Sequence, residues 1–131
     1  MHRPMKRRVS AQVSAAPNFA TSLQATHAFM VVQDAASASS RLAQLKRDLR
    51  EMKTLLAWSP AGGRPERFLH ANSVQASLRL AAVQQLAQSA GLPHLREYVS
   101  GSHVVLYAHS DTEVVLLSLK HHRQLTYITL Q

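Results

Sequence analysis

The chain has 131 residues, of which 46% are hydrophobic, and a formal net charge of +8 with its eight histidines counted as neutral. This length predicts one domain over residues 1–131, with residues 1–7 as a flexible arm. No run of about 18 apolar residues occurs, so we expect no membrane-spanning helix. No apolar segment of the secretory type follows the basic start, and we expect a cytoplasmic protein. Cysteine is absent, which excludes disulfides and thiolate chemistry. The positive charge favours a polyanion or an acidic protein as partner.

The first predicted elements are a strand and a helix. Apolar and polar residues alternate from Arg8 to Ser14, which predicts a strand with one apolar face. Pro17 breaks this strand, and Asn18 is the candidate N-cap of the helix that follows. Steps of four, three and four residues predict the buried face of this helix: Phe19, Leu23, Thr26 and Met30.

The clearest periodicity predicts a second helix over residues 35–58. Its apolar seam has heptad spacing and consists of Ala38, Leu42, Leu45, Leu49, Met52 and Leu56. Two seams joined by a short connection predict an antiparallel helical hairpin, whose surface also offers a contact for a homodimer. A second row on this helix, Lys46, Arg50 and Lys53, indicates either a solvated face or a ridge that contacts phosphates.

Glycine and proline end the hairpin. Gly63 and Pro65 predict a tight exit from the second helix, and Arg64 between them is a candidate for a structural or a functional role. A third helix is predicted over residues 73–90, where Gly91 ends it, as a peripheral cover.

The C-terminal part predicts a hairpin of two strands. A short strand over residues 94–99 precedes it. The first strand of the hairpin contains residues 104–107, and its turn is residues 110–112. The strand over residues 114–117 is continuously apolar, as in a strand covered on both faces. It leads into potentially cationic residues, and we expect them to form a basic cluster on the surface: Lys120, His121, His122 and Arg123. For His121 and His122, a strand end half-packed under the C-terminal tail is the alternative. Residues 124–130 predict a last strand or a packed end.

The predicted fold class is therefore α+β, with a small, mostly antiparallel sheet of about four strands and the helices on one face. The histidines form no metal constellation, because neither cysteines nor clustered carboxylates complete a site. The Gly62-Gly63 pair lacks the lysine and the serine or threonine of a phosphate loop. We expect neither a metal nor a cofactor.

Three pieces of the sequence, in order, resemble the RelE/ParE superfamily of bacterial type II toxin–antitoxin toxins. The first is the helical hairpin with Gln33-Asp34-Ala35-Ala36 at its turn. The second is Pro60-x-x-Gly63-Arg64-Pro65 after the second helix. The third is Leu95-Arg96-Glu97, followed by Val104-Val105-Leu106-Tyr107, a second apolar strand and His121-His122-Arg123-Gln124. Together they extend over residues 9–127.

The resemblance implies a cytoplasmic toxin that a cognate acidic antitoxin holds inactive. ParE-like members, among them plasmid stabilisation proteins, poison DNA gyrase, whereas RelE-like members cut mRNA in the ribosome. In RelE-like nucleases an arginine commonly lies in the strand where this chain has Val104. The resemblance therefore favours the ParE-like branch. The predicted third helix is longer than the connection that the family implies there.

The two activities give two sets of candidate residues. A nuclease needs an acid, a base and phosphate contacts, for which the candidates are Arg96, Lys120, His121, His122, Arg123 and Tyr127. A binding toxin needs a contact surface for its target or its antitoxin, for which the candidates are Arg64, Arg96, Tyr107, Lys120, His122 and Arg123. A third hypothesis is a basic accessory protein that binds nucleic acid or protein without toxicity. The sequence leaves open whether the chain is an enzyme.

Overall fold

The computed structural model describes residues 10–65, 84–85, 87–89 and 91–121. Its helices are α1 (Pro17–Gln33), α2 (Ala38–Trp58) and the short 3-10 helix η1 (Pro60–Gly62). Its strands are β1 (Gln12–Ala15), β2 (Arg64–Pro65), β3 (His94–Ser100), β4 (His103–His109) and β5 (Glu113–His121). Residues 84–85 and 87–89 are also helical. The predicted α+β class is confirmed.

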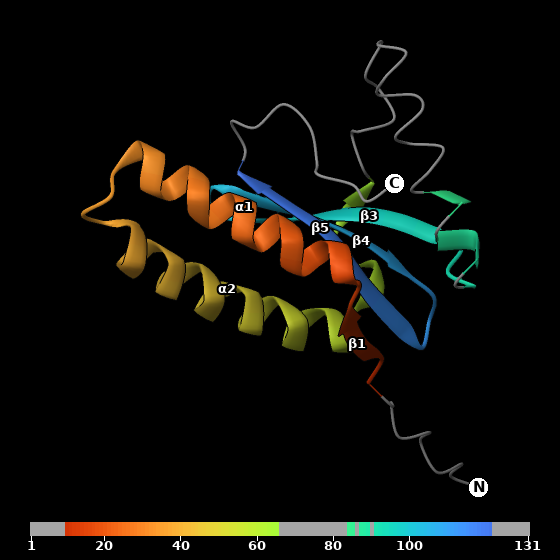
Figure 1. Cartoon of the computed structure of the whole chain (residues 1–131). Coiled ribbons are helices and arrows are strands. Elements are labelled where there is room, and N and C mark those ends of the chain that lie inside the picture. Colours follow the sequence, from red (N-terminus) through yellow and green to blue (C-terminus); the bar gives the residue numbers. More distant parts are fainter. Residues whose placement is uncertain (1–9, 66–83, 86, 90, 122–131) are drawn as a thin grey trace, which may run out of the picture.

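The strands form one five-stranded sheet in the order β1-β5-β4-β3-β2. β1 pairs with β5 in parallel, and the other neighbouring strands are antiparallel. The sheet is therefore mixed, with one strand more than the predicted four, because the two-residue β2 extends it beyond β3. In Figure 1, α1 and α2 lie side by side as the predicted antiparallel hairpin and cover one face of the sheet. None of the helices in the described ranges is long and apolar enough to cross a membrane.

The core is divided by the sheet into two clusters. Val105 and Tyr107 of β4 pack with the helical hairpin. The alternate residues Val104 and Leu106 point to the opposite face, as successive strand residues must, and pack there with Ala87. The prediction that all helices lie on one face is therefore wrong, because the helical residues around Ala87 cover the other face. Most of the predicted third helix, residues 73–83, lies outside the described residues.

The heptad seam of α2 is largely confirmed. Leu42 is half-buried, and the other predicted positions are buried: Ala38, Leu45, Leu49, Met52 and Leu56. The helix begins three residues later than predicted because Asp34 stabilises a turn instead. Its carboxylate accepts hydrogen bonds from the Ala36 N–H (3.1 Å) and the Ser37 hydroxyl (3.0 Å).

The buried face of α1 is partly polar, which the apolar pattern did not predict. Asn18 is not the N-cap, since Ala16 occupies that position. The Asn18 side chain lies inside the first turn and donates from Nδ2 to the Leu117 carbonyl (3.0 Å). One turn later, the Ser22 hydroxyl accepts the Leu119 N–H (2.9 Å) and donates to the Phe19 carbonyl (2.8 Å).

These contacts have a clear cause in the sheet. The pairing of β1 with β5 ends at Leu116, so the rest of β5 has no strand on that edge among the described residues. Buried backbone N–H and C=O groups need partners. The side chains of Asn18 and Ser22 supply partners for Leu117 and Leu119, and α1 therefore takes the place of a longer edge strand.

We predict that Ser22→Ala lowers the free energy of unfolding by about 1–3 kcal/mol, because the buried Leu119 N–H loses its acceptor. Thr26 is the matched control on the same face: it is also fully buried, but its hydroxyl makes no hydrogen bond within the described structure. Thr26→Val should leave stability unchanged or increase it, because an unpaired polar group is removed. Urea unfolding of both variants measures the difference; equal losses would contradict the assigned role of Ser22.

Candidate functional site

Tyr107 connects the exit from α2 to the centre of the sheet. Its side chain is fully buried, and its hydroxyl donates to the Pro60 carbonyl (2.7 Å). The same oxygen accepts the Gly63 N–H (2.9 Å). Burial raises the pKa of Tyr107, although the Gly63 bond and the nearby Arg96 charge act in the opposite direction. The phenol is therefore a neutral bridge that fixes η1 and the start of β2 against β4.

Arg96 lies opposite Tyr107 in the β3–β4 ladder and extends the same network. Its Nη1 donates to the Gly63 carbonyl (3.3 Å), and its Nε donates to Nε2 of His109 (3.1 Å). A guanidinium can only donate hydrogen bonds, so Nε2 of His109 is an acceptor. Nδ1 then carries the proton and donates to the Ser110 carbonyl (3.0 Å). The imidazole is consequently held neutral in one tautomer.

One further ring, that of His94, completes this cluster. The His94 ring lies 4.9 Å from the His109 ring, centroid to centroid, and the Tyr107 ring lies 5.8 Å from it. Burial lowers the pKa of His109; the Ser110 bond and Asp111 oppose this effect, and the charges of His94 and Arg96 add to it. His94 is exposed, whereas His109 is buried.

A second charged cluster lies on the opposite face of the sheet. Arg64 and Glu97 are cross-strand partners and form an ion pair (Nε to Oε1, 3.3 Å). The Glu97 side chain is only 4% exposed, against 38% for Arg64. Lys120 of β5 lies on this face too, since it pairs with Val104. Burial lowers its pKa; the Glu97 charge opposes this shift and the Arg64 charge adds to it.

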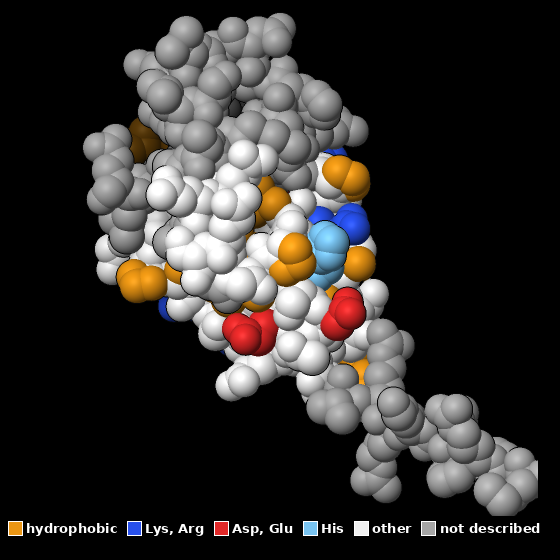
Figure 2. Space-filling model, turned by 90° about the vertical axis from the view of Figure 1, so that its right-hand side faces the viewer, with side chains coloured by type: hydrophobic (Ala, Val, Ile, Leu, Met, Phe, Trp, Pro, Cys, Tyr) orange, Lys and Arg blue, Asp and Glu red, His pale blue; other side chains and the backbone are white. Residues whose placement is uncertain are grey.

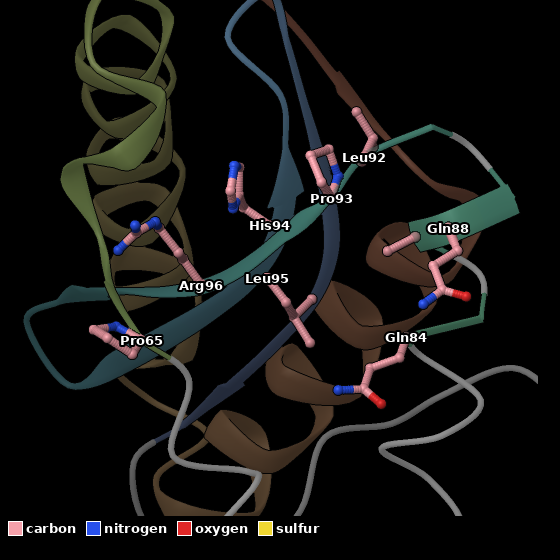
Figure 3. A pocket seen from close by; sticks show the side chains of 9 residues that line it. Pro65, Gln84, Gln88, Leu92, Pro93, His94, Leu95 and Arg96 are labelled. Atoms are coloured by element: carbon pink, nitrogen blue, oxygen red, sulfur yellow. The ribbon is translucent and has the colours of Figure 1, made fainter.

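An open groove of about 350 Å³ lies at the start of β3, where His94, Leu95 and Arg96 are among the residues that line it. Figure 3 shows that Leu95 points toward the helical residues that carry Gln84 and Gln88. Arg96 points the other way, toward the ribbon of the α2 exit. On the face shown in Figure 2, histidine and Lys or Arg side chains adjoin, with hydrophobic side chains around them. The groove thus combines an apolar side with hydrogen-bond donors.

The predicted site residues do not form one cluster. Arg96 and Tyr107 share the network at the α2 exit, while Arg64 and Lys120 lie on the other face of the sheet. His121 is buried rather than part of an exposed tip: its ring lies 5.4 Å from Phe29 of α1 and 5.2 Å from His103. The alternation of β5 turns it toward α1. The candidates His122, Arg123 and Tyr127 lie outside the described residues.

Three residues of these clusters, His94, Glu97 and His109, were given no role from the sequence. A signal for His109 was nevertheless present. The two-residue turn Gly101-Ser102 sets the register of β3 and β4, which places Arg96 beside Tyr107 and His94 beside His109. The pairing of Glu97 with Arg64 cannot be predicted in this way, because β2 and β3 are separated by a long stretch of chain.

Comparison with known proteins adds no assignment. A scan against protein-family models found no match to this chain, and a search of curated proteins found none either.

In chemical terms, the two clusters differ. At the α2 exit, the donors of Arg96 and the hydroxyl of Tyr107 serve hydrogen bonds within the chain. On the opposite face, Lys120 has a lowered pKa near a buried carboxylate. Within the described residues, no group of three or more histidine, aspartate or glutamate side chains is placed to hold a metal ion.

We predict that Gly63→Ala is destabilising by about 1–3 kcal/mol, because a methyl group there overlaps the surrounding structure. Its Cβ would collide with the Glu97 carbonyl and would lie 2.7 Å from the Tyr107 hydroxyl. Gly62→Ala is the matched control, since its Cβ would lie 3.5 Å from the nearest atom, Oγ of Ser59, in ordinary contact. Thermal unfolding of both variants tests this difference. Similar melting temperatures for the two would show that the exit does not pack tightly on Tyr107.

We also predict that His109 makes stability dependent on pH. The pKa of His109 in the folded chain lies below its ordinary value of 6.5. As pH falls, the unfolded chain therefore takes up the proton first. The stabilisation is complete above pH 6.5 and is lost as pH falls through the lowered pKa of the folded state. In His109→Gln, which keeps an acceptor for Arg96 but does not titrate, this loss should disappear.

Urea unfolding between pH 5 and 8 measures the effect, and the NMR titration of the His109 ring assigns it. Parallel stability curves for the wild type and His109→Gln would contradict the proposed neutral imidazole.

Proposed function

We propose that this chain is a toxin of the RelE/ParE type that arrests bacterial growth by binding DNA gyrase in the manner of the ParE-like branch. A cognate acidic antitoxin neutralises it. One observation carries the family part of the proposal: two of the three sequence pieces behind the resemblance are bonded to each other. Gly63 of the second piece donates to Tyr107 of the third, and Arg96 of the third donates back to the Gly63 carbonyl.

The first piece joins the same unit. The helical hairpin packs on the face of the sheet to which Tyr107 belongs, and α2 leads directly into η1. The three pieces, which lie far apart in the sequence, are therefore in contact in the fold. A chance similarity of three short patterns gives no reason for such a meeting, so this arrangement supports the proposal.

Binding, rather than RNA cleavage, accounts better for the described candidates. Arg64 is paired with buried Glu97, and Arg96 is hydrogen-bonded to His109 and Gly63. The hydroxyl of Tyr107 is committed to Pro60 and Gly63. These side chains stabilise the α2 exit, and a toxin that acts by binding needs a rigid surface but no acid–base pair.

The alternative function, a RelE-like ribosome-dependent mRNA nuclease, is supported by Lys120. A lysine that acts as a general acid or base near neutral pH needs a lowered pKa. Burial lowers the pKa of Lys120, and Arg64 lies close enough for its charge to act in the same direction. Arg64 and Lys120, on the face of the sheet opposite the helical hairpin, are where an RNA phosphate would bind.

Expression in bacteria, with and without the neighbouring open reading frame, tests the proposal. We predict growth arrest that expression of the neighbouring reading frame relieves, together with gyrase-dependent DNA cleavage. Purified gyrase should lose its supercoiling activity, while cellular mRNA should stay intact. The control Arg47→Ala, on the exposed face of α2, should retain the gyrase effect.

Two outcomes contradict this assignment. The nuclease would be established if cellular mRNA were cut while gyrase was unaffected, and if Lys120→Ala abolished the cutting but Arg47→Ala did not. Absence of growth arrest would favour the third hypothesis, a basic accessory protein without toxicity.

A further inference from the structure

The Gly63 carbonyl is bonded by a side chain whose position depends on His109. Arg96 donates to this carbonyl from Nη1 (3.3 Å) and to Nε2 of His109 from Nε (3.1 Å). Because the guanidinium is planar and rigid, the bond to His109 also fixes the direction in which Nη1 points. The contact with Gly63 therefore requires an imidazole whose Nε2 carries no proton.

β2, which begins directly after Gly63, makes few bonds of its own to the sheet. It is two residues long and pairs with Glu97 and Arg96 of β3. Its second residue, Pro65, has no N–H to donate. Both backbone polar groups of Gly63 are instead bonded by side chains, because its N–H is donated to the Tyr107 hydroxyl (2.9 Å). The attachment of β2 therefore depends largely on this side-chain network.

We propose that His109 is an acid-operated switch that releases β2 from β3. Protonation of Nε2 turns the acceptor of the Arg96 bond into a donor and places a second cation against the guanidinium. Arg96 then turns away, and the Gly63 carbonyl loses its donor. Within the described structure, Gly63 is then attached only through its N–H. This bond to Tyr107 breaks whenever the short strand leaves β3.

The surroundings of His109 set the direction of this switch. Burial has the largest effect, and it lowers the pKa of His109. In the β4–β5 turn, the Ser110 carbonyl and Asp111 favour a positive charge on the ring. On β3, His94 and Arg96 face the ring, and both oppose a positive charge there. The closed network therefore keeps the ring neutral, and uptake of a proton in acid favours the open form.

Within the described chain, the other elements that surround the ring add no charge. Tyr107, on the same strand, keeps a neutral phenol because burial raises its pKa. On β5 the ladder partner of His109 is the apolar Val114, and β1 beyond it contains no charged residue. η1 contains none either. Arg96 and His94 are thus the groups that a protonated His109 meets.

Release of β2 also opens the charged cluster on the opposite face of the sheet. Arg64 of β2 forms the ion pair with Glu97, whose side chain is only 4% exposed. A buried carboxylate is costly without its partner, so Glu97 becomes accessible to water when Arg64 leaves. The charges of Glu97 and Arg64 both act on Lys120. The titration of one ring beside Tyr107 thus controls access to the cluster around Lys120.

Hydrogen exchange of the purified full chain, followed by NMR, tests the switch. Between pH 8 and pH 5 the protection factor of the Gly63 amide, corrected for the intrinsic pH dependence of exchange, should fall on the order of tenfold. Low concentrations of urea should accelerate exchange at Leu106, which is paired on both sides in the centre of the sheet. They should leave Gly63 unaffected, because release of a two-residue strand exposes little surface.

Three variants assign the effect to His109. His109→Gln keeps an acceptor for Arg96 but does not titrate, so its protection of Gly63 should not depend on pH. His27→Gln is the matched control, since His27 lies on α1 outside the network, and it should retain the loss seen in the wild type. His109→Arg places a permanent cation against Arg96 and should show the low protection already at pH 8. Circular dichroism establishes which variants are folded; the two glutamine variants decide the question if His109→Arg is not.

Carboxyl labelling tests the link to the opposite face of the sheet. The wild type and His109→Gln are treated with a carbodiimide and an amine at the same pH of 5, and the modified residues are identified by mass spectrometry. Glu97 should react on the order of tenfold faster in the wild type, in proportion to the fraction of open molecules.

Three results would overturn the proposal. One is protection of Gly63 that does not change with pH, or that changes equally in His109→Gln. Another is a urea dependence at Gly63 equal to that at Leu106, which would show unfolding of the whole domain instead of release of β2. The third is equal labelling of Glu97 in the wild type and His109→Gln. All of these measurements use purified protein, so they are independent of growth arrest and of gyrase.

Discussion

The structure depends on the way β5 satisfies its backbone on both edges. β4 pairs along one edge, but β1 covers only the first residues of the other. Beyond that point, Asn18 and Ser22 of α1 bond the backbone at Leu117 and Leu119. A helix whose buried face is partly polar is otherwise unfavourable, because buried polar groups need partners. Here the polar face is the reason that α1 lies directly on the strand, and α2 follows because its apolar seam must cover the remaining face of the sheet.

A second constraint links the exit from α2 to the middle of the sheet. The hydroxyl of Tyr107 bridges Pro60 and Gly63, and Arg96 holds the same glycine from the neighbouring strand. Gly63 has no Cβ, and this permits the close approach. Arg96 and Tyr107, which the sequence predicts as site residues, therefore stabilise the fold through this network. Their rigidity also fixes the neutral state of His109, which makes the exit sensitive to pH.

Among the described residues, the positively charged side chains differ in their surroundings. Arg64 is compensated by Glu97, and Arg96 is turned inward to the exit of α2. The row Lys46, Arg50 and Lys53 on α2 remains exposed beside a groove between α1 and α2. This contrast between engaged and exposed cations is what separates the candidate surfaces.

The sequence by itself determined the elements whose signals are local. The heptad seam of α2 and the strand hairpin around residues 110–112 follow from periodicity and turn chemistry. Only the tertiary structure decided which polar residues are buried, and on which face each cation lies. The sequence predicts Asn18 as an N-cap, whereas in the fold its side chain bonds the backbone of β5. The sequence also predicts His121 as part of a basic cluster on the surface, whereas in the fold its ring packs against α1. Periodicity reports local repeats of burial. It does not report which distant backbone groups lack a hydrogen bond, and these groups set the final arrangement.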